Sequence, residues 1–205
     1  MSVGVNVSAV QFRHERFLHV VRKVLDESGL PAPCLELELT EGLLLANADV
    51  TLFMLRELVR MGLKLSIDDF GTGYSSLSYL RQFPVNRLKI DRAFVKSMTE
   101  DPDAAVITGT IINMAKSLRL RVIAEGVENE KQLHLLRAQK CEEVQGFYFS
   151  RPLVAEDFAA KMRNNTILRI AEPDLIKVPD GWPAGASTSM HGASALEFAP
   201  ARDAH

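Results

Sequence analysis

The stretch LKLSIDDFGTGYSSL, residues Leu63–Leu77, contains an apolar run that ends in two adjacent carboxylates, Asp68 and Asp69. Apolar and polar residues alternate over Leu63–Ile67, which predicts a β-strand, with a turn at the two glycines beyond the aspartates. Neighbouring carboxylates raise each other's pKa, and a divalent cation relieves their repulsion. The stretch therefore predicts a cation site where a strand ends. The alternative is a helix N-cap followed by a solvated turn.

The same periodicity along the chain predicts strands that alternate with helices. The predicted strands are Val3–Val7, Leu35–Leu39, Leu63–Ile67, Arg87–Ile90, Arg121–Ala124 and Val144–Tyr148. The predicted helices, whose apolar residues lie three or four positions apart, include Phe17–Leu25, Leu52–Val59, Ala104–Leu118, Glu130–Ala138 and Ala155–Met162. Such alternation is typical of parallel strands joined by right-handed crossovers, in a doubly wound sheet or a closed barrel.

Polar residues at the strand ends separate these two folds. They lie at or near the carboxyl ends of all the predicted strands, as Asn6, Glu38, Asp68, Asp69, Lys89, Glu125 and Gln145. In a (β/α) barrel every strand delivers its carboxyl end to one shared mouth, whereas an open sheet gathers ligands mainly at one switch point. We therefore predict an α/β fold, a TIM-like (β/α) barrel, with about six of its eight strands in this chain.

The composition limits the partners. The 205 residues include 47% hydrophobic residues and carry a formal net charge of -2, so we expect a globular protein that does not bind DNA. No apolar run approaches the ~20 residues that span a bilayer, so we expect no membrane segment. Cys34 and Cys141 have neither metal-ligand nor redox spacing, which fits a reducing compartment and predicts a cytoplasmic location.

The character of the chain changes near its end. Four prolines and a stretch rich in Gly, Ala and Ser follow residue 165. We therefore predict a barrel domain over residues 1–165 and a largely flexible extension over residues 166–205.

The polar set has a defined chemistry. It offers carboxylate and amide oxygens without His or Cys, which favours Mg²⁺ or Mn²⁺ over zinc. Its acidic groups suffice for two ions, the usual arrangement for attack of water on a phosphodiester. Lys89 beside such ions would orient the water or balance charge. The alternative for Lys89 is an ordinary ion pair with Asp91.

Six motifs resemble one known family. They occur in the order VNVSAVQF, LELELTE, IDDFGTGYSSL, LKIDRAFV, VIAEGVEN and QGFYFSRPL. Together they resemble the EAL-domain cyclic di-GMP phosphodiesterases. The resemblance implies a TIM-like barrel that hydrolyses cyclic di-GMP to the linear dinucleotide with two Mg²⁺ or Mn²⁺ ions.

The resemblance also implies roles for individual residues. The implied metal ligands are Asn6, Glu38, Asp68, Asp69 and Glu125. The implied catalytic set comprises Lys89, which orients the water, Glu125, Gln145, which completes the water network, and Glu41, which holds the loop after IDDFGTG. Asp91 and Gln145 are the implied substrate contacts. The loop Gly71–Ser76 is the implied homodimer contact.

One departure from the family pattern affects activity. The Glu-Ala-Leu signature, with another metal-binding Glu, and a phosphate-binding Arg precede the Asn6 motif in the family, and these 205 residues contain neither. We therefore expect a truncated product or a fragment of a longer signalling protein with upstream sensory or regulatory domains. We expect it to lack two barrel strands, to hydrolyse cyclic di-GMP negligibly alone, and to associate through exposed sheet edges. The alternative function is a non-catalytic cyclic di-GMP receptor or dimerisation module. Retention of the other metal ligands favours enzymatic ancestry.

Overall fold

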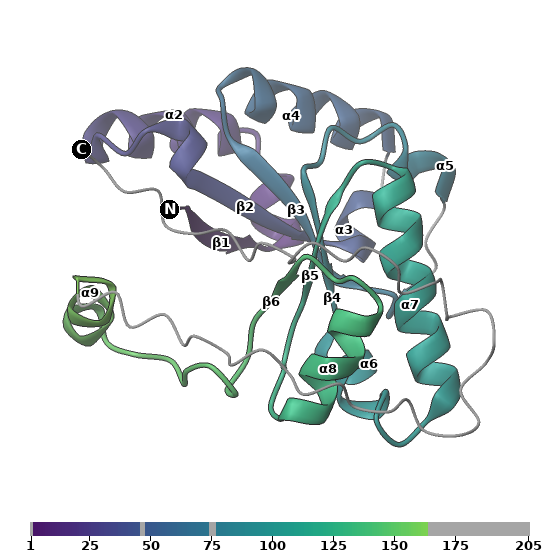
Figure 1. Cartoon of the computed structure of the whole chain (residues 1–205). Helices are drawn as coiled ribbons and strands as arrows, with labels where there is room; N and C mark the ends of the chain where they lie inside the picture. Colours follow the sequence, from purple (N-terminus) through teal and green to yellow (C-terminus); the bar gives the residue numbers. More distant parts are fainter. Residues whose placement is uncertain (1, 46–47, 74–76, 164–205) are drawn as a thin grey trace.

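The computed structural model describes residues 2–45, 48–73 and 77–163. These residues form a six-stranded parallel sheet whose strands follow one another in chain order (Figure 1). The strands are β1 Val3–Val7, β2 Leu35–Thr40, β3 Lys64–Phe70, β4 Arg87–Ile90, β5 Arg121–Ala124 and β6 Glu143–Val144. Each of the six predicted strands overlaps an observed strand, and their parallel connections are confirmed.

Helices connect the strands. They are α1 Ala9–Phe12, α2 Phe17–Ser28, α3 Glu41–Leu45, α4 Ala48–Arg60, α5 Leu77–Leu80, α6 Arg92–Ser97, α7 Pro102–Ser117, α8 Glu130–Ala138 and α9 Ala155–Arg163, with a 3-10 turn η1 at Ala32–Cys34. Helices α2, α4, α7 and α8 follow one another around one side of the sheet (Figure 1). Helix α2 ends at Gly29, whose left-handed φ of 66° is costly for residues with a Cβ.

The core lies between the sheet and these helices. Alternate strand residues such as Leu39, Leu65 and Leu88 are fully buried. Because side chains alternate across a sheet, the residues between them face the other side. That inner face is polar, and it carries the buried Glu36, Ser66 and Lys89.

Within the described residues the sheet is open, with β1 and β6 at its edges, so the barrel is partial. No helix in this part of the chain is long and apolar enough to cross a bilayer. Cytoplasmic location remains a prediction. The predicted flexible extension over residues 166–205 lies outside the described residues, which end at residue 163.

Two strands have bounds that differ clearly from the predicted ones. Strand β3 does not stop at Ile67 but continues to Phe70, so both aspartates lie inside it. Strand β6 covers Glu143–Val144 rather than Val144–Tyr148. Beyond β6 the chain approaches the Val127 backbone so closely that a Cβ on Gly146 would lie 2.1 Å from the Val127 oxygen. The two segments remain hydrogen-bonded here, since Gln145 N–H donates to Ala124 O and Val127 N–H donates to Gln145 O.

Candidate metal and active site

A bulge in β3 brings the two aspartates together. The pairing of β3 with β4 shifts register between Ile67 and Phe70, and Asp69 has a left-handed φ of 53°. The side chains of successive strand residues normally point to opposite faces of the sheet, and a bulge changes the direction of one of these side chains. Oxygens of Asp68, Asp69 and Glu125 consequently lie within 4.8 Å of one another. The alternative of a helix N-cap is wrong, because Asp68 is buried within a strand.

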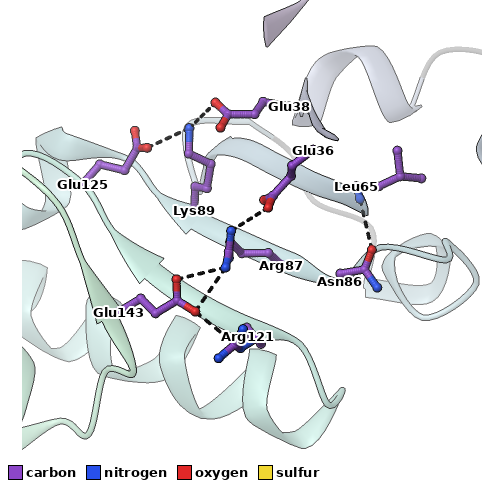
Figure 2. A network of polar contacts seen from close by, with 9 residues as sticks. All are labelled: Glu36, Glu38, Leu65, Asn86, Arg87, Lys89, Arg121, Glu125 and Glu143. Carbon is purple, nitrogen blue, oxygen red and sulfur yellow. Dashed lines mark hydrogen bonds and ion pairs between the residues drawn. The ribbon is translucent and has the colours of Figure 1, made fainter. Parts of the chain in front are cut away.

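Lys89 joins this cluster from β4. Its Nζ lies 2.5 Å from Glu38 Oε2, 2.7 Å from Glu125 Oε1 and 2.9 Å from Asp68 Oδ1. Figure 2 shows Lys89 between Glu38 and Glu125. Lys89 is thus paired with three carboxylates, and the predicted alternative of a simple pair with Asp91 is not what the described residues form.

The pKa values of the cluster reflect burial and crowding. Burial alone would lower the pKa of Lys89, but hydrogen bonds to Glu125, Glu38 and Asp68 outweigh it and hold this pKa above its ordinary value. Burial raises the pKa of Glu125, although Lys89 opposes the shift. Burial, together with the charges of Asp68 and Asp91, raises the pKa of Asp69. Lys89 is therefore protonated at neutral pH.

The donor set fits a hard divalent cation. Three carboxylates from two strands converge, and their ligand atoms are all oxygens. Burial raises the pKa of Asp69 and of Glu125, and the negative charge of Asp68 adds to both shifts. Added positive charge relieves this crowding, and oxygen ligands suit Mg²⁺ or Mn²⁺.

The remaining predicted site residues lie around this cluster. Gln145 Nε2 donates a hydrogen bond of 2.5 Å to Glu125 Oε1. Asp91 accepts a hydrogen bond from the Ala93 amide at the start of α6, and its charge contributes to the raised pKa of Asp69. Asn6 is exposed and is aligned with Glu38 across the β1–β2 pair.

Glu41 is farther from the cluster. It is buried at the start of α3, and its Oε2 accepts from the Gly71 amide at 3.2 Å. A Cβ on Gly73 would lie 2.9 Å from Glu41 Oε1, so the loop packs directly against this carboxylate. The predicted dimer loop, Gly71–Ser76, falls partly outside the described residues, which end at Gly73 and resume at Leu77.

Sequence reasoning missed a second polar network beneath the cluster. Arg87 pairs with Glu36 and Glu143, and Arg121 also approaches Glu143 (Figure 2). The signal for it was present, because Glu36, Arg87 and Glu143 each stand two residues before a predicted site residue. Such i and i+2 positions share a face of a strand.

This curved parallel sheet with acidic residues at its carboxyl ends belongs to a known class. The family model for the EAL domain matches residues 1–152, and the chain belongs to this family. Over 158 residues it is 45% identical to the signaling protein YkoW of Bacillus subtilis, covering 77% of this chain and 20% of YkoW. Over 153 residues it is 47% identical to the cyclic di-GMP phosphodiesterase NbdA of Pseudomonas aeruginosa, covering 75% of this chain and 20% of NbdA.

Solved structures are also similar to this chain in fold. The PaMucR phosphodiesterase in complex with c-di-GMP matches with a TM-score of 0.75 and 43% identity, over 77% of this chain and 64% of that one. The BlrP1 complex of Klebsiella pneumoniae with manganese and cy-diGMP matches with a TM-score of 0.68 and 30% identity, over 74% of this chain and 39% of that one. The TIM-like barrel fold is thereby confirmed. The chain spans about a fifth of the length of these curated relatives.

Proposed function

We propose that this chain carries the metal-dependent site of a phosphodiesterase that hydrolyses cyclic di-GMP to the linear dinucleotide. The observation that carries the proposal is the convergence of Asp68, Asp69 and Glu125 oxygens within 4.8 Å, beside buried Lys89, in a chain of the EAL family. The names of NbdA and PaMucR support the choice of substrate.

The proposed ligands of two Mg²⁺ or Mn²⁺ ions are Asn6, Glu38, Asp68, Asp69 and Glu125. Solved BlrP1 complexes that contain calcium or manganese together with cy-diGMP support a divalent cation at this kind of site. When bound, such a pair of cations supplies Lewis-acid stabilisation of the developing phosphate charge and lowers the pKa of the attacking water.

Side chains of this protein hold and orient the reactants. Lys89 contacts Glu38, Asp68 and Glu125 as a hydrogen-bond donor, and it would stabilise negative charge that develops beside them. Gln145 fixes Glu125 through its amide group. Asp91 lines the mouth where substrate enters, and Glu41 holds the loop at Gly71. In the reaction the water oxygen adds to phosphorus and one P–O ester bond breaks, and the proton that the water gives up is balanced by the proton that the departing oxygen takes.

Calorimetric titration of cyclic di-GMP into residues 1–205 tests the proposal. Ca²⁺ binds oxygen ligands with looser geometry than Mg²⁺, so we expect it to support binding without turnover. Binding should require the cation, should weaken in Asp69→Asn, and should be retained in Asp26→Asn, which alters an exposed residue of α2. Cation-independent binding would favour the receptor alternative, and absence of binding with Ca²⁺ would contradict the proposal.

We also propose that the chain forms a homodimer through the Gly71–Ser76 region and works within a longer protein with regulatory domains. The proposal of a longer protein is supported by the coverage of the relatives, because the chain spans about a fifth of the length of YkoW and of NbdA. Light scattering of the purified chain should give the mass of a dimer. The mass of a monomer at concentrations where the site binds cyclic di-GMP would contradict the first part.

A further inference from the structure

Arg87 links three strands that are not neighbours. Its Nη1 lies 2.6 Å from Glu36 Oε2, and its Nη2 lies 3.0 Å from Glu143 Oε2 (Figure 2). Glu36 belongs to β2, Arg87 to β4 and Glu143 to β6, and the sheet follows chain order. The two ion pairs therefore cross the inner face over β3 and over β5.

This network lies one layer beneath the proposed site. Glu36 stands two residues before Glu38, Arg87 before Lys89, and Glu143 before Gln145. Side chains two apart on a strand share a face and lie about 7 Å apart along it. In (β/α) barrels, alternate strands supply the members of one interior layer, and these are usually branched apolar residues. In this protein Glu36, Arg87 and Glu143 place charged side chains in such a layer.

Stability does not explain the charged layer. The side chain of Glu36 is only 4% exposed and that of Arg87 19%, so both lose hydration. Buried ion pairs often add little net stability compared with apolar residues of similar volume. In addition, Arg87 Nε is buried without a hydrogen-bond partner in the described part of the chain. The pairs do impose geometry, because the planar guanidinium presents its nitrogens in a rigid fork.

We propose that Arg87 is a positioning residue: by tying β2 and β6 to β4 beneath the site, it sets the spacing of Glu38, Lys89 and Gln145. The proposal rests on the proposed function, because it assigns these three residues to a metal-dependent site. It does not require Arg87 to touch the metal or the substrate.

A double variant separates geometry from stability. Glu36→Leu with Arg87→Met removes both buried charges and leaves apolar side chains of similar size, so we expect unchanged or higher Tm. In this double variant we expect the Mn²⁺ affinity of residues 1–205, measured by calorimetry, to fall about tenfold. A loss of this size is typical when a residue that holds a metal ligand in place, without touching the metal, is replaced. Arg121→Met is the matched control, because Arg121 is 62% exposed and approaches Glu143 without linking strands across the inner face. It should keep wild-type Mn²⁺ affinity.

A second variant keeps the proposal testable if the double variant does not fold. Arg87→Lys keeps the charge but offers one nitrogen where Arg87 uses two, so we expect a folded chain with Mn²⁺ affinity between those of wild type and the double variant. Wild-type Mn²⁺ affinity in whichever of these variants folds would overturn the positioning role and leave the proposed function standing. A wild-type chain that binds no Mn²⁺ would overturn both.

Discussion

Lys89 Nζ lies 2.5 Å from Glu38 Oε2 and so connects β4 to β2 across the intervening strand. The same ammonium contacts Asp68 and Glu125, which makes it the central charge of the site. A group with this many acidic partners stays protonated, and its contribution is hydrogen bonding and charge.

Asp68→Asn should weaken Mn²⁺ binding strongly, because Asp68 is the buried member of the carboxylate cluster and the proposed bridge between the ions. In a domain with turnover, the loss should reach several orders of magnitude, as expected when a two-metal site is broken. Calorimetry and product chromatography measure the two effects. Asp26→Asn on the outer face of α2 is the control, and equal behaviour of the two variants would contradict the assignment.

Gly71→Ala should destabilise the fold by about 1–3 kcal/mol, the usual range for overpacking. Gly71 has a φ of 100°, and an added Cβ would lie 2.8 Å from Phe94 Cε2. Gly42→Ala is the control, because an added Cβ there meets nothing within 4 Å. Since Gly42 lies in α3, its replacement should instead stabilise by about 0.5–1 kcal/mol. Urea unfolding compares the two variants, and equal midpoints would contradict the prediction.

Cys141 should react slowly with iodoacetamide in the folded protein. Burial raises the pKa of its thiol from 9.0 to about 11, which leaves about a hundredfold less thiolate at pH 8. Cys34 is only half-buried and should be modified first. Because the folded-state pKa is the raised one, this thiol also makes the fold less stable as the pH rises from about 9 to 11. Peptide mass spectrometry after labelling measures which of the two thiols reacts first. Modification of Cys141 before Cys34 would contradict the prediction.

Deleting residues 181–205 should leave the thermal stability and cyclic di-GMP binding nearly unchanged. The deleted segment is rich in Gly, Ala and Ser and offers few side chains for a core. Thermal unfolding of the two chain lengths measures the effect. A loss above about 2 kcal/mol, a large share of the stability of a typical domain, would show that this segment packs.

Local periodicity predicted six parallel strands with Glu38, Asp68 and Lys89 at or near their carboxyl ends, and the structure brings these three side chains together. Strands such as Arg87–Ile90 match their predicted ends, because polar and apolar residues alternate there without interruption. The bulge at Asp69 was not predictable in this way, since it depends on how β3 pairs with β4. The i and i+2 spacing places Glu36, Arg87 and Glu143 on the face of the site, but it does not say which of these charges meet across an intervening strand.

The most direct test of the central claim is the yield of linear dinucleotide from cyclic di-GMP in the presence of Mn²⁺, quantified by chromatography. Residues 1–205 alone should give negligible product, because they lack the Glu-Ala-Leu signature glutamate and the phosphate-binding arginine that the family resemblance implies. Fusing the corresponding strands of an EAL relative before Met1 should restore turnover that Asp68→Asn abolishes. A fused, folded domain that binds Mn²⁺ and cyclic di-GMP yet yields no linear dinucleotide would contradict the account.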